Sequence, residues 1–225
     1  MNFFKMLTGK KSRPDDDPRV RVTKDISAED FVLVNDQSYE YREKVLPAAC
    51  TVEFWEGSGL VRFLSDARFL KSEILDVGCG SGEIDIIIAK KGYDITAVDI
   101  SPYAIQIAQK HADNSSECKG RLTFLAGDIE RMEFDKKFST AIVSHTLEHV
   151  INPDTMMEKV ISLLEPGSHI LVAVPNKKAW NDRTHLRHYS KRSLTKLLTQ
   201  YSHELETWID KVERMIFAVL KTPDK

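Results

Sequence analysis

Short apolar runs alternate with longer stretches of mixed polarity through most of the chain after Ile74. The apolar runs predict strands over 73–78, 94–99, 121–126, 138–144 and 168–174. The stretches between and after them predict helices over 82–91, 102–112, 153–164 and 190–201. Strands and helices that alternate at this spacing favour an α/β fold with a parallel, doubly wound sheet.

The two ends of the chain depart from this alternation. Two strand-like runs over 204–211 and 213–221 have no helix between them, so we predict an antiparallel hairpin there. Residues 27–70 are predicted to be helical, beginning at a capping pattern headed by Ser27. Residues 1–25 are polar and rich in charge, and we expect them to form a flexible tail.

Length, charge and cysteine content narrow the class of protein. The 225 residues are enough for the tail and one domain, 26–225, and the formal net charge of −2 argues against nucleic acid as a partner. Cys50, Cys79 and Cys118 are unclustered, which indicates a reducing compartment rather than disulfides or a zinc site. No apolar run reaches membrane-spanning length and no signal peptide is evident, so we expect a cytoplasmic protein without membrane insertion.

The most informative segment runs from Ile74 to Glu83. An apolar strand enters a turn with glycines at three alternate positions, Gly78, Gly80 and Gly82, and a helix is predicted to follow. Glycine suits such a turn because it allows positive φ and close approach of a ligand to the backbone. The next strand ends in a carboxylate, Asp99, at the distance expected for a ribose ligand. Together these features predict a nucleotide-binding site.

The spacing and the charge of this turn indicate which nucleotide it binds. Dinucleotide folds use G-x-G-x-x-G and hold a pyrophosphate at the helix N-terminus, whereas this turn reads G-x-G-x-G. Asp76 and Glu83 flank the turn, and no lysine or arginine lies between Glu73 and Lys90. These carboxylates would repel a pyrophosphate, which weakens the case for an NAD-dependent oxidoreductase. They suit S-adenosylmethionine, which carries an ammonium and a sulfonium group.

At this point the chain resembles class I S-adenosylmethionine-dependent methyltransferases. The segments that resemble the motifs of this family, in the same order, are 76–82, 98–101, 126–129 and 163–168. Residues 147–150 and 185–190 are further similar to the subgroup that includes the ubiquinone-biosynthesis O-methyltransferases.

The resemblance implies a seven-stranded, mostly parallel sheet with an antiparallel C-terminal hairpin. It also implies that residues 26–70 form a helical lid over a Rossmann-like core, 71–225. Tyr41 and Trp55 lie in the expected lid, where they line the acceptor pocket or simply pack between helices.

The resemblance also implies a set of contacts with S-adenosylmethionine. Asp76 and the backbone of Gly78 and Gly80 would hold the methionine portion, with Gly82 as the third glycine of the motif. Asp99 would accept both ribose hydroxyls, because one carboxylate suits two adjacent donors. The alternative for each aspartate is a turn or N-cap role, but three of them at successive strand ends favour binding.

Further implied contacts surround the adenine and the reactive end of the cofactor. Ile100 would pack on the adenine, Asp128 would accept from its exocyclic amine, and the amide of Ile129 would reach the ring. The other members of this predicted set, which follow Ile100 or end the fourth strand, are Ser101, Ser144 and His145.

The chemistry of the methyl acceptor is expected near His149. An oxygen acceptor must lose a proton, and a histidine with a near-neutral pKa can take it; a structural role for His149 is the alternative. A metal is a second alternative, because some related O-methyltransferases carry Glu-x-x-Glu-His as ligands. Here His145 replaces the first glutamate, so a divalent ion on His145, Glu148, His149 and His185 is not the favoured interpretation.

The sequence therefore favours a methyltransferase that acts on a small molecule, at oxygen. Two alternatives remain open. One is a metal-dependent terminal 2′-O-methyltransferase of RNA, and the other is a non-catalytic module that only binds S-adenosylmethionine.

Overall fold

The computed structural model describes residues 22–23, 25–115, 118–177 and 184–224. Most of the predicted flexible tail, 1–25, lies outside these residues. Val22 is described, however, and it is buried against Phe31 and Val34 in a small cluster. Packing therefore reaches upstream of the predicted start of the domain at residue 26.

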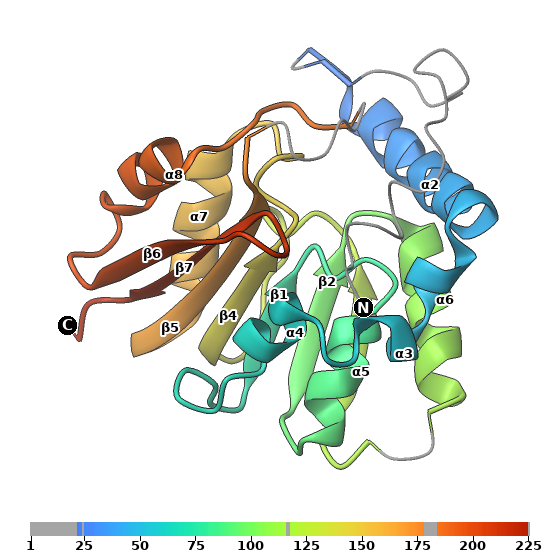
Figure 1. Cartoon of the computed structure of the whole chain (residues 1–225), viewed down its shortest axis with the longest axis horizontal. Coiled ribbons are helices and arrows are strands. Elements are labelled where there is room, and N and C mark those ends of the chain that lie inside the picture. Colours follow the sequence, from blue (N-terminus) through green and yellow to red (C-terminus); the bar gives the residue numbers. More distant parts are fainter. Residues whose placement is uncertain (1–21, 24, 116–117, 178–183, 225) are drawn as a thin grey trace.

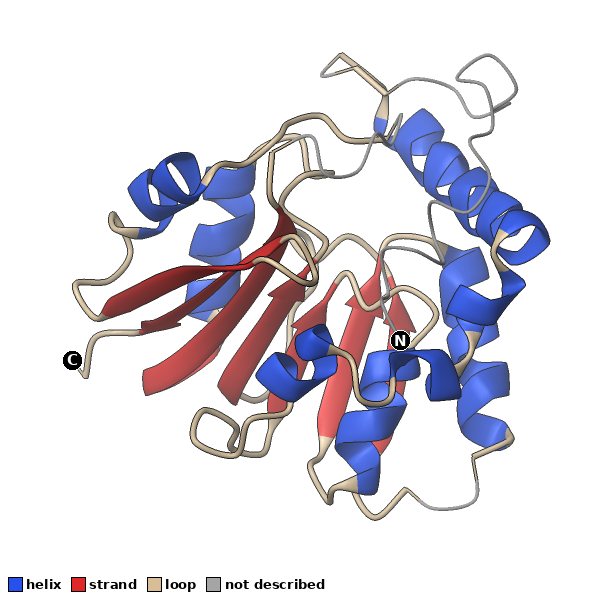
Figure 2. Ribbon diagram, in the orientation of Figure 1, coloured by secondary structure: helices blue, strands red, loops and turns tan. Residues whose placement is uncertain are grey.

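The centre of the fold is a seven-stranded sheet in the order β3-β2-β1-β4-β5-β7-β6 (Figures 1 and 2). Neighbouring strands from β3 to β5 are parallel, whereas β7 is antiparallel to both β5 and β6. The strands are β1 Ile74–Val77, β2 Ile95–Asp99, β3 Leu122–Ala126, β4 Phe138–Ser144, β5 Leu164–Pro175, β6 Leu205–Asp210 and β7 Met215–Lys221. The predicted fold class, including the C-terminal hairpin, is confirmed.

Successive side chains of each central strand point to opposite faces of the sheet and pack into two separate apolar layers. Leu75 and Val77 of β1 point to the layer of α7 (Pro153–Ser162) and α8 (Lys191–Leu198). Ile74 points the opposite way, to the layer of α5 (Glu83–Lys90) and of α4 (Gly59–Leu64). This division follows from the two-residue period of a strand, and burial on both faces explains the apolar runs of the sequence.

Several predicted element boundaries differ from the observed ones, and three elements show the reasons. β5 begins at Leu164 rather than at 168, because Leu164 pairs with Phe138 before a register shift in the ladder with β4. The helix predicted over 190–201 covers only Lys191–Leu198, because Ser190 is its N-cap and forms a capping box with Ser193. The helix predicted over 153–164 ends at Ser162, because β5 already begins at Leu164.

The predicted helical region before the sheet consists of α2 (Ala28–Val45), a 3-10 turn (Pro47–Cys50), α3 (Val52–Trp55) and α4. Ser27 caps α2 by accepting from the backbone N–H of Asp30, as the sequence predicts. Figure 1 shows α2 above the carboxyl ends of the central strands, next to α6 (Pro102–Asp113). The carboxylate of Asp36 attaches α2 to the start of α6, because it accepts from the backbone N–H of Tyr103.

Within the described residues, no helix is both long enough and apolar enough to cross a bilayer.

Candidate active site

A cavity of about 580 Å³ opens at the carboxyl ends of β1, β2 and β4 and is covered by α2. These ends flank the point where strand order reverses around β1, which is where open α/β sheets bind their ligands. Its lining includes ten of the residues singled out from the sequence: Asp76, Gly78, Gly80, Asp99, Ile100, Asp128, Ile129, Ser144, His145 and His149. The buried hydroxyl of Ser144 has no hydrogen-bond partner among the described residues.

Two of the residues predicted to bind the cofactor, Gly82 and Ser101, do not line this cavity. Ser101 is fully buried as the N-cap of α6, where its hydroxyl accepts from Ala104 N–H and donates to Asp36. Gly82 brings α5 close to its neighbours, since a Cβ there would meet the ring of Phe124 at 2.6 Å. In this structure the Ser101 side chain caps a helix, and Gly82 allows close helix packing.

The glycine turn requires glycine at each of its three positions. Gly78, Gly80 and Gly82 have φ values of +80°, +60° and +76°, in the left-handed region that other residues rarely adopt. Each is also in a tight space, and a Cβ on Gly78 would lie 2.3 Å from the hydroxyl oxygen of Thr146. That hydroxyl donates to the carbonyl of Val77, which ties the turn to the end of β4.

Gly78→Ala should therefore cost more stability than a glycine substitution in open space. Gly57 is a matched control, because its φ of +79° is nearly the same but a Cβ would have nothing within 4 Å. We expect Gly57→Ala to lower the free energy of unfolding by about 1–3 kcal/mol through backbone strain alone. Gly78→Ala should lose about 1–3 kcal/mol more through overpacking. Urea unfolding of both variants measures the difference, and equal losses would contradict a role for Thr146.

Asp99, at the end of β2, is the most heavily bonded carboxylate at the cavity. Its Oδ2 accepts from the backbone N–H of Gly80 at 2.9 Å, and its Oδ1 accepts from the N–H of Ser101 at 2.9 Å. The hydroxyl of Tyr39, on α2, donates to Oδ2 at 3.2 Å. Asp99 therefore already receives a hydroxyl donor in this structure, as expected of an acceptor for ribose hydroxyls.

Three buried carboxylates form the floor of the cavity and the layer under it. Asp76 and Asp99 are each at most 5% exposed, and Asp85, on α5, is fully buried. Burial raises the pKa of Asp76 to about 7 and raises those of Asp85 and Asp99 above their ordinary values. Among the described residues, none of the three pairs with a lysine or an arginine. The floor is thus built for a ligand that brings positive charge.

Asp128 follows β3 and lines the cavity beside the buried Ile129. Its Oδ1 accepts from the backbone N–H of Glu130, and its Oδ2 lies 3.5 Å from the guanidinium of Arg131. The turn role considered from the sequence is therefore present. It does not exclude ligand contact, because a carboxylate has about four acceptor sites.

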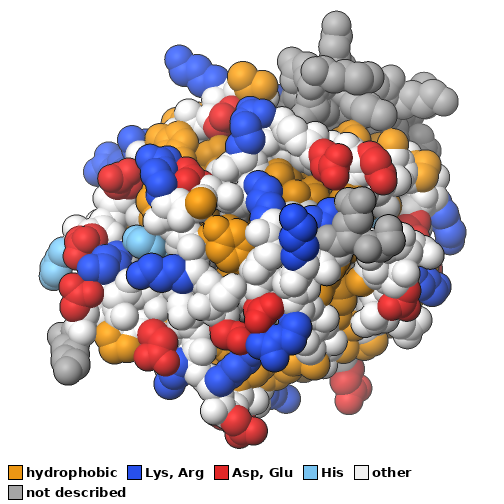
Figure 3. Space-filling view, turned by 90° about the horizontal axis from the view of Figure 1, so that it is seen from below, with side chains coloured by type: hydrophobic (Ala, Val, Ile, Leu, Met, Phe, Trp, Pro, Cys, Tyr) orange, Lys and Arg blue, Asp and Glu red, His pale blue; other side chains and the backbone are white. Residues whose placement is uncertain are grey.

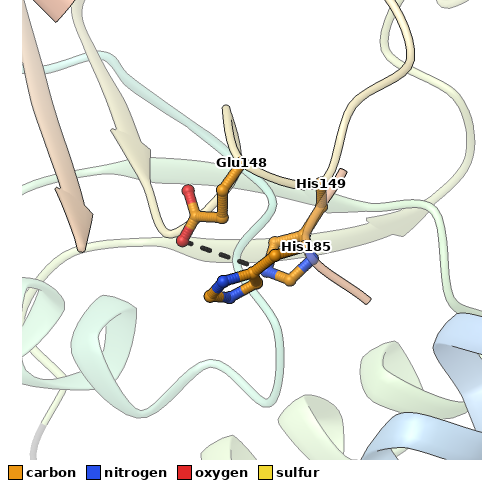
Figure 4. Close-up of side chains that lie close together, drawn as sticks. All are labelled: Glu148, His149 and His185. Atoms are coloured by element: carbon orange, nitrogen blue, oxygen red, sulfur yellow. Dashed lines mark ion pairs between the residues drawn. The ribbon is translucent and has the colours of Figure 1, made fainter. Parts of the chain in front are cut away.

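Histidines surround a buried glutamate at the end of β4. Glu148 is 1% exposed, and Figure 4 shows it beside His149 and His185. Its Oε1 lies 3.3 Å from Nδ1 of His145 and 3.9 Å from Nε2 of His149. Burial alone would raise the pKa of Glu148, but the neighbouring histidines lower it below its ordinary value, so this side chain is a carboxylate.

The hydrogen bond at His149 Nδ1 determines which ring nitrogen can accept a proton. Nδ1 lies 3.2 Å from the carbonyl oxygen of Thr184. Because a carbonyl only accepts, Nδ1 carries the hydrogen and the lone pair of the neutral ring is on Nε2. Nε2 is also the nitrogen that faces Glu148, so a proton gained there would meet a buried negative charge.

The predicted metal ligands are brought together only in part. Ligand atoms of Glu148, His149 and His185 all lie within 4.8 Å of one another, whereas His145 is not part of this group. Two nitrogens and one carboxylate oxygen form a donor set that suits zinc or another divalent transition metal. His145 instead contacts Glu148 from a backbone with a φ of +54°.

In the part of the loop after β5 that the structure describes, Leu186 and Arg187 support the turn that carries this histidine cluster. The guanidinium of Arg187 donates to the carbonyls of Leu147, Val150 and Ile151, and Leu186 N–H donates to the carbonyl of Glu148. These bonds hold the turn after β4 in place. Trp180 and Arg183 of the same loop lie outside the described residues.

A helical lid was expected from the sequence, but among the α2 residues that line the cavity only aromatic residues were singled out. The residues that this helix contributes to the lining are Ala28, Phe31, Asn35, Ser38, Tyr39, Tyr41 and Arg42. Most of them recur every three or four residues, which is a helical period, so a helix face of mixed polarity was the signal present in the sequence. Tyr41 and Trp55, the aromatics left open between pocket and packing, also line the cavity. Arg42 lies 6.0 Å above the Trp55 ring and donates to the carbonyl of Ala49.

Known proteins resemble this chain in sequence. Residues 70–217 match the family model described as "Methyltransferase domain". The ubiquinone biosynthesis O-methyltransferase of Schizosaccharomyces pombe, a mitochondrial protein, is 32% identical over 47% of this chain and 38% of its own length. The ubiquinone biosynthesis O-methyltransferase of Rickettsia akari is 31% identical over 49% of this chain and 43% of its own. The matches thus span less than half of each of these relatives.

Solved structures share the fold. The N-methyltransferase NodS of Bradyrhizobium japonicum, in complex with S-adenosylhomocysteine, aligns with a TM-score of 0.64 at 19% identity, covering 84% of this chain and 98% of NodS. A structure from Methanosarcina mazei, described as an S-adenosylmethionine-dependent methyltransferase, aligns with a TM-score of 0.57 at 20% identity, covering 69% of this chain and 96% of its own. Both the predicted family and the predicted fold are thereby confirmed. The chain belongs to the methyltransferase-domain family and has the fold of S-adenosylmethionine-dependent methyltransferases.

Proposed function

We propose that this chain transfers the methyl group of S-adenosylmethionine to an oxygen atom of a small molecule. The observation that carries the proposal is the acidic floor of the cavity. Asp76, Asp85 and Asp99 are buried together, and no lysine or arginine of the described residues compensates them. A cationic adenosyl ligand would supply the missing charge, whereas a pyrophosphate would be repelled.

The residues around the floor fit such a ligand at each of its polar groups. Asp76 would accept from the ammonium group, and Arg42, on the lid helix, would pair with the carboxylate. Asp99 would accept from the ribose hydroxyls, where the Tyr39 hydroxyl now donates. Ile100 and Ile129 would flank the adenine, with Asp128 accepting from its amine.

When bound, the ligand supplies a methyl group activated by a positively charged sulfur. The protein's own contribution to the reaction is position and proton removal. Burial raises the pKa of Asp99, and the nearby His149 offsets part of that rise, so the base and the cofactor floor are neighbours. Nε2 of His149 would take the proton of the acceptor hydroxyl while Nδ1 stays bonded to Thr184. Glu148 would then stabilise the charged ring.

A metal-assisted version is a second candidate, favoured by the convergence of Glu148, His149 and His185. These side chains fit a divalent ion by donor type and by proximity. There His149 would be a ligand rather than a base. We prefer the base, because Glu148 already has histidine partners on two sides and the family's first acidic ligand is replaced by His145.

The choice of a small-molecule acceptor rests on the relatives and on charge. The two curated relatives named above are O-methyltransferases of ubiquinone biosynthesis. An RNA substrate would need a basic surface, but the net charge is −2. On the face that Figure 3 displays, basic and acidic side chains are interspersed. We also propose a cytoplasmic location, supported by the three free cysteines.

Calorimetry with S-adenosylhomocysteine and with NAD tests the cofactor part of this proposal. We expect S-adenosylhomocysteine to bind with a micromolar dissociation constant and NAD to show no measurable heat, because its pyrophosphate would meet the acidic floor. Binding of NAD alone would overturn the proposal. A methyl-transfer screen with labelled S-adenosylmethionine, across phenols, sugars, carboxylates and short RNA, then tests the acceptor. Cofactor binding without transfer to any of them would favour the non-catalytic module.

A further inference from the structure

Asp85 is a buried acid that the proposed reaction does not use. It lies in the first turn of α5, is fully buried, and does not line the cavity. Both of its carboxylate oxygens, and Oδ1 of Asp76, lack an N–H or O–H partner among the described residues. A charged carboxylate without partners is strongly disfavoured in such a buried place, so the charge of Asp85 must be removed or compensated there.

The carboxyl groups of Asp85 and Asp76 lie within hydrogen-bonding reach of each other. Asp76 is on the face of β1 that looks toward α5, and Asp85 approaches it from that helix. Two carboxylates have no hydrogen to share, so this contact is a bond only when one of the pair is protonated. Like charges at such short range also cannot both ionise easily.

The other titratable groups around the pair add negative charge or none. Asp99 faces Asp76 from β2, Glu83 faces Asp85 from α5, and the half-buried Cys79 lies close to all three aspartates. Within the part of the chain that the structure describes, no cation is among the groups that act on either member of the pair. The ligand-free pair therefore holds a proton near neutral pH.

We propose that Asp85 is a positioning residue that shares one proton with Asp76, and that this proton leaves for solvent when a ligand ammonium group binds to Asp76. The inference rests on the proposed binding of S-adenosylmethionine. The shared proton orients Asp76 toward the cavity before the ligand arrives. The positive charge of the ligand then replaces the positive charge of the proton. Ligand affinity should consequently rise with pH while the pair is still protonated.

Proton release can be measured by titrating the full chain with S-adenosylhomocysteine in phosphate and in imidazole buffer. These buffers differ in ionisation enthalpy, so the difference in heat gives the number of protons released. At about pH 6 the wild-type protein should release close to one proton, and its affinity should rise about tenfold per pH unit between about pH 5.5 and pH 7. Asp85→Asn keeps the size of the side chain and can donate to Asp76. It should release almost no proton, and its affinity should change less than about twofold over the same range.

Asp113→Asn is the matched control, because it removes one carboxylate from the exposed end of α6, away from the cavity. It should behave like the wild-type protein. Binding to the wild-type protein without proton release would overturn the inference, and this result needs no variant. Equal release by Asp85→Asn would also overturn it, because the proton would then come from another group. No binding of S-adenosylhomocysteine at all would instead contradict the proposed function.

Discussion

Asp99→Ala should weaken the binding of S-adenosylhomocysteine by about a hundredfold or more. The expected loss combines two hydrogen bonds from ribose hydroxyls to a charged acceptor, each worth about 1.5–3 kcal/mol. The variant would also release the glycine turn, because Asp99 holds the backbone N–H groups of Gly80 and Ser101. Both effects lower affinity, and calorimetry measures their sum.

Asp94→Ala is the matched control for this experiment. Asp94 directly precedes the same strand, at the end remote from the cavity, where it pairs with Arg121 on the surface. Its removal should leave affinity unchanged while costing at most about 1 kcal/mol of stability. If Asp99→Ala bound the ligand as tightly as Asp94→Ala does, the ribose assignment would be wrong.

Much of the sheet could be predicted because the strands between its two edge strands are largely buried on both faces. Such strands stand out in the sequence as uninterrupted apolar runs. Because parallel strands end at the same edge of the sheet, the residues at their carboxyl ends lie at the cavity, among them Asp76, Asp99 and Ser144. The boundaries at Leu164 and Ser190 were less accessible. The first depends on pairing with Phe138, and the second depends on which serine caps the helix.

The contributions of α2 and α5 to the site could not be predicted in the same way. Tyr39 and Asp99 are 60 positions apart in the sequence, and the hydrophobic periodicity of a helix or a strand gives no information on a contact over that separation. Asp85 looks like an ordinary acidic residue in the first turn of a helix, which is a favourable position in itself. Only the packing of α5 on β1 reveals that it is buried beside Asp76.

Ser101 is a residue whose motif position suggests a ligand contact but whose side chain is bonded within the fold. The residue follows Asp99 closely enough to be counted with the site. Its hydroxyl is, however, committed to capping α6 and to Asp36, which ties the lid helix to the core. Asp99 remains bound to its backbone N–H, so the two residues act together in shaping the floor.

His149→Ala should abolish methyl transfer while leaving the binding of S-adenosylhomocysteine nearly unchanged. Loss of a general base typically lowers kcat by about 10²–10⁴-fold. Affinity should persist because the residues proposed to hold the ligand, Asp76 and Asp99, keep their own partners. The measurements are turnover with the acceptor found in the labelled screen and calorimetry with S-adenosylhomocysteine. His203→Ala, at an exposed histidine, is the matched control and should be fully active.

His185→Ala separates the base from the metal ligand. If His149 is a base, the loss of His185 removes a ring neighbour whose centroid lies 4.8 Å away rather than a catalytic group, and kcat should fall less than about tenfold. If Glu148, His149 and His185 hold a divalent ion, His185→Ala should be nearly as inactive as His149→Ala. A chelator should then also abolish the activity of the wild-type enzyme. We expect activity to survive both His185→Ala and the chelator, because Thr184 and Glu148 suffice to orient His149 and to stabilise its charged form. Full activity of His149→Ala would contradict both versions and leave this histidine a structural role.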